Sequence, residues 1–182
     1  MNPGAVPVDS SRAMRINNLR LSLRRYAAVC LVLCAGLIGD AIAQVGAAQV
    51  GAAPAAGVKR ALLASLDAIV RPDVILASNT SSISITVLAA ATKRPDRVLG
   101  MHFMNPVPLM PLVELIRGQA TSAESMRIAS ELCITLGKTP VEAADFPGFI
   151  ANRILMPMIN EAIFAVMEGV GTVAAIDTVM TL

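Results

Sequence analysis

The chain has 182 residues, 55% of them apolar and only 15% charged, and its net charge is +2. This length suits one domain, or one domain with part of a second, and the apolar share excludes a chain that is disordered throughout. The small charge argues against a nucleic-acid binder with a broad basic surface, and the 3% of aromatic residues are too few for base-stacking platforms. Three cysteines in apolar stretches, Cys30, Cys34 and Cys133, favour a reducing compartment over a disulfide framework or a zinc site.

The first part of the sequence changes character twice. Residues 1–26 form a basic arm with five arginines and one acid, and residues 27–57 are nearly all small or apolar. The uncharged run 27–39 has 13 residues, whereas a membrane span needs roughly 20. This run is therefore too short to cross a membrane by itself.

Two interpretations of the apolar stretch remain open. In the first, Ala27–Cys34 is a buried parallel strand that leads into a tight turn and a helix. In the second, the stretch is the apolar region of a secretory signal, with Arg24 and Arg25 as its basic flank and residues 41–43 as a small-residue cleavage site. We favour the strand because of the motifs that follow it.

From Val58 onward, helix and strand patterns alternate. A stripe of apolar residues predicts a helix over Val58–Ile69, and a short apolar run predicts a buried strand at Val74–Ala77. Five small hydrogen-bonding residues, 78–82, follow that strand directly. Such a cluster suits the carboxyl end of a parallel sheet, where ligands bind, although most clusters of this kind are plain polar loops.

The later elements are predicted from their start and stop signals. Thr121 and Glu124 form a capping box that opens a helix ending near Leu136. A long apolar stripe predicts a helix over Ile150–Glu168 with one side facing a core, and Pro157 should kink or interrupt it. The other expected elements are a short helix capped by Ser84 or Thr86, strands Val98–Phe103 and Leu112–Ile116, an extended segment Thr139–Glu142, and a final helix from Thr172.

His102, the only histidine, lies near the end of a predicted strand that leads into a proline-rich loop. Three prolines within residues 106–111 exclude a strand there, so the loop joins two antiparallel strands. If this hairpin is symmetric about Pro108, His102 lies opposite Glu114, at a Cβ separation of about 4.5–5.5 Å. That separation suits a hydrogen bond between the imidazole and the carboxylate.

A histidine–carboxylate pair has a specific chemical use. The carboxylate fixes the tautomer of the imidazole and stabilises the imidazolium that forms when the ring accepts a proton. His102 would then be a general base for a hydroxyl group, with the hydroxyls of residues 78–82 near the same crevice. The alternative is a core histidine that happens to face a glutamate.

Four segments of the sequence carry a recognisable pattern: Ala77–Ser82 (ASNTSS), Gly100–Pro108 (GMHFMNPVP), Leu112–Glu114 (LVE) and Pro147–Arg153 (PGFIANR). Together they resemble the NAD-dependent 3-hydroxyacyl-CoA dehydrogenase family, and its bacterial 3-hydroxybutyryl-CoA dehydrogenase branch looks most similar. The resemblance runs from about Val58 to Leu182 without a gap.

The resemblance implies an α/β fold, with a reduced Rossmann-type sheet in residues 27–145 and the start of an all-helical C-terminal domain in residues 146–182. It implies NAD as the cofactor and an acyl-CoA substrate, with no nucleic-acid or membrane partner, in the cytoplasm or alternatively in the mitochondrial matrix. The helical domain supplies most of the dimer contact in this family. A homodimer is therefore expected only if that domain is complete.

The resemblance also implies roles for individual residues, none of them a metal ligand. His102 would be the catalytic base, oriented by Glu114, while Ser81 and Asn152 would contact the reacting end of the substrate. The residues expected to contact the cofactor are Lys59, Ser81, Asn105 and a degenerate dinucleotide fingerprint at Gly36, Leu37, Ile38 and Gly39.

The cofactor-binding part departs from the family pattern. Cys34 stands at the first glycine position of the fingerprint, and no Asp or Glu between Asp40 and Asp67 could bind the ribose. Residues 46–57 lead directly to a segment that should come several strands later, which indicates a large internal deletion. We therefore expect NAD binding to be weaker by about two to three orders of magnitude and turnover by this chain alone to be small or absent.

Three hypotheses of function remain. The chain is a shortened enzyme of fatty-acid or butyrate metabolism, a catalytically inactive fragment of the same family, or an exported protein led by residues 1–43. Binding of NADH distinguishes the first two, and N-terminal sequencing of the expressed chain identifies the third.

Overall fold

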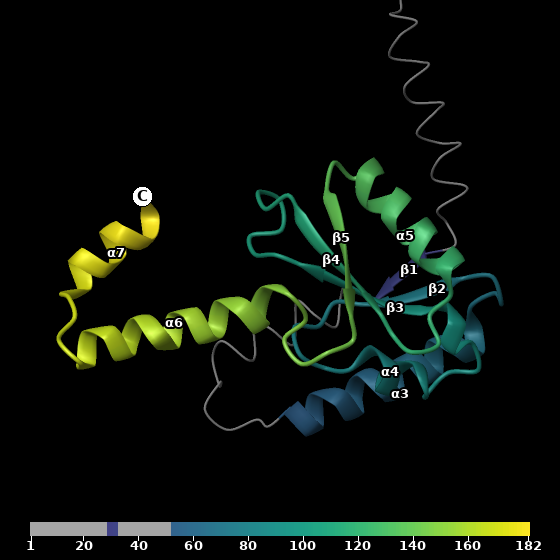
Figure 1. Ribbon diagram of the computed structural model, residues 1–182. Coiled ribbons are helices and arrows are strands. Elements are labelled where there is room, and N and C mark those ends of the chain that lie inside the picture. Colours follow the sequence, from purple (N-terminus) through teal and green to yellow (C-terminus); the bar gives the residue numbers. More distant parts are fainter. Residues whose placement is uncertain (1–28, 33–51) are drawn as a thin grey trace, which may run out of the picture.

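A five-stranded mixed sheet forms the centre of the structure, a computed structural model that describes residues 29–32 and 52–182. Its strands, in an order that is the same in space and in sequence, are β1 (Val29–Val32), β2 (Ile75–Ser78), β3 (Val98–Phe103), β4 (Leu112–Arg117) and β5 (Thr139–Ala144). β1, β2 and β3 are parallel to one another, β4 is antiparallel to β3, and β5 is parallel to β4. The β3–β4 pair is the predicted hairpin (Figure 1).

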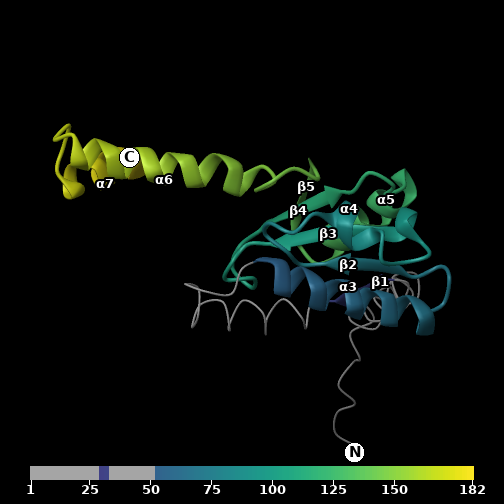
Figure 2. The same cartoon turned by 90° about the horizontal axis from the view of Figure 1, so that it is seen from below.

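Helices cover both faces of the sheet, and two further helices extend away from it. They are α3 (Ala52–Ile69), α4 (Ile85–Ala89), α5 (Ala123–Thr135), α6 (Ala151–Met167) and α7 (Val173–Thr181), with a short 3-10 helix η1 (Pro95–Arg97) before β3. α3 and α4 pack on one face of the sheet and α5 packs on the other. α6 projects from the sheet, and α7 turns back beside α6 (Figures 1 and 2).

The predicted parallel strand at Ala27–Cys34 is found in a shorter form as β1. It pairs with β2 from Val29 opposite Ile75 to Val32 opposite Ser78. This pairing favours the strand over the signal-peptide interpretation. The basic arm, the fingerprint residues 36–39 and the proposed cleavage site at 41–43 lie outside the described residues.

Alternation along β3 divides the core into two layers and decides where His102 lies. Leu99 and Met101 pack under α5, whereas Val98 packs under α3 and α4. His102 is four residues after Val98, so its side chain lies on the same face of the strand, the face covered by α3 and α4.

A glycine on the same face of β3 lets α4 approach the sheet closely. A Cβ on Gly100 would lie 2.9 Å from the Cβ of Ile116 and 3.0 Å from the side chain of Ile85. Any larger residue would therefore push α4 away from the strand that carries His102.

The capping box predicted at Thr121 and Glu124 is wrong by one residue. Ser122 is the N-cap of α5, and its side chain accepts a hydrogen bond from the backbone N–H three residues later. The hydroxyl of Thr121 is buried and donates instead to the carbonyl of Val98 at 2.6 Å. A tertiary hydrogen bond to β3 therefore determines which of two adjacent hydroxyls caps the helix.

The long C-terminal helix also departs from expectation. Pro157 lies inside α6 without ending it, and no residue of α6 or α7 is buried. The apolar side of α6 that was expected to face a core is exposed, for example at Leu155 and Ile159. Within the part of the chain that the structure describes, no helix is long and apolar enough to span a membrane.

An ion pair holds α3 against the connection between α4 and β3. The side chains of Arg94 and Asp67 are 13% and 7% exposed, and their Nε and Oδ1 atoms are 2.5 Å apart. The other oxygen of Asp67 accepts from the backbone N–H of Lys93 at 2.8 Å, and Arg94 donates to the carbonyl of Val70. Removing one partner leaves the other charge almost buried and unpaired.

We predict that Asp67→Asn lowers the free energy of unfolding by about 3 kcal/mol, because it breaks a nearly buried ion pair. Urea titrations at neutral pH measure this loss. The matched control is Asp73→Asn, which removes the exposed pair with Arg71, and we expect no measurable change from it. Equal effects of the two substitutions would contradict the prediction.

Candidate active site

A line of three side chains crosses the α3–α4 face near the carboxyl ends of β2 and β3. The imidazole of His102 lies between Glu114 and Ser81, with Nδ1 2.8 Å from Glu114 Oε2 and Nε2 3.0 Å from Ser81 Oγ. The register places His102 opposite Glu114, as the symmetric hairpin predicts. His102 is 5% exposed and Glu114 is 1% exposed, whereas Ser81 is exposed.

The hydrogen-bond partners assign the imidazole proton. A carboxylate can only accept, so Nδ1 of His102 donates to Glu114. In the neutral ring Nε2 is then the acceptor, and the hydroxyl of Ser81 donates to it. The nitrogen that can take up a proton therefore faces the exposed side of the site.

The second oxygen of Glu114 binds the start of α6. Oε1 accepts hydrogen bonds from the backbone N–H groups of Ile150, at 3.0 Å, and Ala151, at 2.9 Å. These groups lack partners within a helix, and the helix dipole favours a negative charge beside them. One carboxylate therefore connects His102 to the first turn of α6.

The turn before α6 brings an aromatic ring to the imidazole. The ring centroids of Phe149 and His102 are 5.7 Å apart at an interplanar angle of 62°, an edge-to-face arrangement. Gly148 and Phe149 both have positive φ, at 80° and 50°. The Pro-Gly pair at 147–148 indicates a turn, but sequence reasoning did not find this ring, because left-handed backbone is not expected of phenylalanine.

Two of the expected contact residues lie beside this line. The side-chain amide of Asn152, in the first turn of α6, donates to the carbonyl of Ser81 at 3.5 Å. Lys59, on α3, donates through Nζ to the carbonyl of Asn79 at 2.5 Å. Asn79 in turn accepts through Oδ1 from the N–H of Phe103 at 3.3 Å, which ties the end of β2 to the end of β3.

Asn105 is exposed in the proline-rich loop after β3. The loop is held from outside by Lys138, whose Nζ donates to the carbonyls of Val107 at 2.6 Å and Met110 at 2.8 Å. The sequence analysis did not predict these hydrogen bonds from Lys138. The fingerprint residues Gly36, Leu37, Ile38 and Gly39 lie outside the described residues.

Asp145 fixes the segment that carries Ser81. Its carboxylate accepts from the N–H groups of Ile85 and Thr86, at 2.9 and 2.8 Å, and from the hydroxyl of Ser84 at 2.7 Å. Burial raises the pKa of Asp145, but the hydrogen bonds from Thr86, Ser84 and Ile85 outweigh it and hold the pKa below its ordinary value of 3.8. Two carboxylates, Asp145 and Glu114, therefore each bind the start of a helix that borders the site.

The arrangement suits proton transfer and offers little to a metal. Across residues 29–32 and 52–182, no group of three or more His, Cys, Asp or Glu side chains could hold a metal ion. Cys133, on the buried side of α5, is fully buried, and burial raises the pKa of its thiol to about 11. What remains is a histidine with one oriented, proton-accepting nitrogen beside several hydrogen-bonding groups.

Comparison with known proteins points to a single family. The family model described as the NAD binding domain of 3-hydroxyacyl-CoA dehydrogenase matches residues 51–146, and the C-terminal domain of the same enzyme matches residues 148–182. A probable 3-hydroxybutyryl-CoA dehydrogenase of Deinococcus radiodurans is 61% identical over 125 residues, which are 69% of this chain and 45% of the relative. A 3-hydroxyadipyl-CoA dehydrogenase of Escherichia coli is 46% identical over 123 residues, which are 68% of this chain and 26% of the relative.

A solved structure gives the same result for the fold. The crystal structure of the (S)-3-hydroxybutyryl-CoA dehydrogenase PaaH1 from Ralstonia eutropha has a TM-score of 0.63 and 52% identity, covering 65% of this chain and 42% of that one. The chain therefore spans less than half the length of these relatives.

We predict that Asp145→Asn destabilises the fold at neutral pH by about 1–2 kcal/mol, because the start of α4 loses a charged cap. Since the pKa of Asp145 is depressed in the folded state, this stabilisation is present above the ordinary pKa and is lost as the pH falls through the folded-state value. The difference between wild type and variant should therefore shrink below about pH 4. Denaturant titrations over a pH series measure it, and a difference that stays constant into strong acid would contradict the prediction.

Proposed function

We propose that this chain, which belongs to the 3-hydroxyacyl-CoA dehydrogenase family, carries the general base for NAD-dependent oxidation of a 3-hydroxyacyl-CoA to a 3-ketoacyl-CoA. One observation supports this proposal above the others, the hydrogen-bonded line Ser81–His102–Glu114. It leaves Nε2 of His102 as the proton-accepting atom on the exposed side. A core histidine without a function would not need an exposed hydroxyl at its second nitrogen.

The residues of this chain would carry the proton half of the reaction. Nε2 of His102 takes the proton of the 3-hydroxyl group while the C–H bond at carbon 3 breaks, and the carbonyl forms. Glu114 stabilises the imidazolium and prevents the ring from turning. Ser81 and Asn152 would bind the oxygen at the reacting end of the substrate. The hydroxyl of Ser81 faces Nε2 of His102, and the side-chain amide of Asn152 is hydrogen-bonded to the backbone carbonyl of Ser81.

The described residues fit a nicotinamide cofactor. The parallel strands β1, β2 and β3 end at one edge of the sheet, which is where dinucleotides bind in doubly wound folds. Lys59 and Asn79 lie at this edge, and we propose that Lys59, Ser81 and Asn105 contact the cofactor there together with Gly36, Leu37, Ile38 and Gly39. When bound, NAD supplies the hydride acceptor.

The dinucleotide fingerprint departs from the pattern that binds NAD tightly. Cys34 replaces a turn glycine and the ribose-binding acid is missing from the expected position. We therefore propose weak cofactor binding and slow turnover by this chain alone, and a cytoplasmic location where NAD and acyl-CoA are both present.

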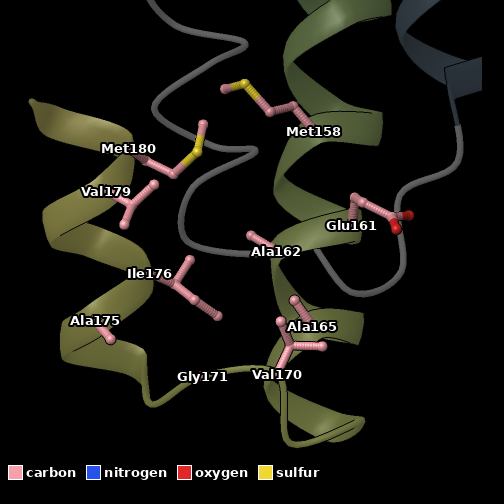
Figure 3. A pocket seen from close by; sticks show the side chains of 10 residues that line it. All are labelled: Met158, Glu161, Ala162, Ala165, Val170, Gly171, Ala175, Ile176, Val179 and Met180. Carbon is pink, nitrogen blue, oxygen red and sulfur yellow. The ribbon is translucent and has the colours of Figure 1, made fainter.

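We further propose that α6 and α7 are the surface through which a homodimer would form. The two helices form a groove of about 480 Å³ lined by apolar side chains such as Met158, Ile176 and Val179 (Figure 3). A second groove of about 350 Å³, which includes Ile163, lies on the same pair of helices. Exposed apolar surface on both grooves is typical of an interaction site.

We predict that the protein associates with itself in a concentration-dependent way and that Ile163→Glu shifts it towards the monomer, because a charge would be buried in the contact. Sedimentation equilibrium measures the association. Ile69→Glu, at a more exposed apolar position at the end of α3, is the control and should not change it. A monomer at all concentrations would contradict this prediction.

The activity is tested with acetoacetyl-CoA and NADH, the reverse reaction, followed by NADH absorbance. NADH is used in the millimolar range so that weak binding does not hide turnover, and the absence of tryptophan lets bound NADH be detected by its own fluorescence. We predict that His102→Gln lowers the rate by about 10² to 10⁴-fold, the usual contribution of a general base. NADH binding should be unchanged.

The control is Arg127→Gln, on the exposed side of α5, which should leave the rate unchanged. If the wild-type protein turns over and His102→Gln is as active as wild type, the assignment of the base is wrong. If NADH does not bind, or binds without turnover, the chain is an inactive fragment of the family.

A further inference from the structure

Phe149 has a backbone conformation that its side chain disfavours. Its φ of 50° makes it the one residue other than glycine with positive φ in the described part of the chain. In this region Cβ crowds the following carbonyl oxygen, so glycine is the usual occupant. Gly148, immediately before it, has a φ of 80° and uses that freedom. Contacts of the phenylalanine side chain must therefore compensate for the unfavourable backbone conformation.

The turn at Phe149 delivers two different groups to the same site. Its ring lies edge-to-face against the imidazole of His102 and is 4% exposed. The next two N–H groups, those of Ile150 and Ala151, bind Glu114 Oε1. Both members of the His102–Glu114 pair are thus contacted by one short turn.

The ring also anchors this turn in the core. Phe149 belongs to the buried cluster under α3 and α4, which includes Leu63, Ile85 and Leu88. Through this packing, its ring is fixed on one side by apolar side chains and presents another part of its surface to the imidazole. An aromatic ring held in this way leaves His102 less room to rotate and keeps water from its Nδ1–Glu114 hydrogen bond.

We propose that Phe149 is a positioning residue for His102: its ring holds the imidazole in the orientation and tautomer in which Nδ1 donates to Glu114 and Nε2 faces Ser81. As a statement about catalysis this inference rests on the proposed function. As a statement about the tautomer of His102 it does not, so the two can fail separately.

The test uses the single histidine of the chain as its own reporter. Full-length protein without a histidine tag is labelled with ¹⁵N-histidine, and its imidazole is observed by NMR above the ordinary titration range of histidine. In the wild type we expect two separate nitrogen resonances, one protonated and one not, and a slowly exchanging Nδ1 proton.

Two substitutions separate the ring from the backbone. Phe149→Leu keeps an apolar side chain in the same backbone conformation but removes the aromatic ring. Phe149→Gly removes the ring and accepts positive φ freely, so the N–H groups of Ile150 and Ala151 stay directed at Glu114. In both variants we expect averaging of the two nitrogen resonances and loss of the slowly exchanging proton. The matched control is Phe146→Leu, an exposed phenylalanine in the same turn, which should keep the wild-type spectrum.

A role in packing alone would lower stability without altering the imidazole. Wild-type nitrogen resonances in folded Phe149→Leu would therefore overturn the inference, whether or not the glycine variant folds. Where the dehydrogenase assay shows turnover, Phe149→Leu should lower kcat by roughly 10 to 100-fold through misorientation of the base and leave KM for the acyl-CoA unchanged. Loss confined to KM would also overturn it.

Discussion

The buried carboxylate of Glu114 is the interaction on which the site depends. At 1% exposure it accepts hydrogen bonds from His102, Ile150 and Ala151, so its charge is compensated by one side chain and two backbone N–H groups. Leaving such a group unpaired would cost far more than any single contact contributes. Among the described residues, no buried side-chain nitrogen or oxygen lacks a partner. Hairpin, imidazole and α6 therefore hold one another in place.

The half of this arrangement that is local in sequence could be predicted. The register of the hairpin follows from the proline-rich loop, and a two-residue period then puts His102 and Glu114 on one face. The strand before Ser81 is recognisable because a short apolar run ends abruptly in hydroxyl side chains. In each case the determining interaction lies within about a dozen residues.

The other half depends on contacts between distant segments that no local pattern contains. The bond from Glu114 to Ile150 joins residues 36 apart in sequence. The hydroxyl of Thr121 donates to the carbonyl of Val98 instead of capping α5. Asp145 caps α4, a helix that begins 60 residues earlier. The positive φ of Phe149 contradicts a rule that normally selects glycine. These are places where tertiary structure overrides local preference, and three of the four border the site.

Among the described residues, the hydrogen bonds of His102 and Glu114 all lie within residues 81–151, whereas the departures from the dinucleotide fingerprint, Cys34 and the lack of an acid between Asp40 and Asp67, lie earlier in the chain. The His102–Glu114 pair and the fingerprint thus lie in separate segments of the sequence, and β1, which precedes the fingerprint, pairs with β2, which precedes Ser81. The orientation of the imidazole, with Nδ1 towards Glu114 and Nε2 towards Ser81, therefore follows from the β3–β4 hairpin, the loop after β2 and the start of α6.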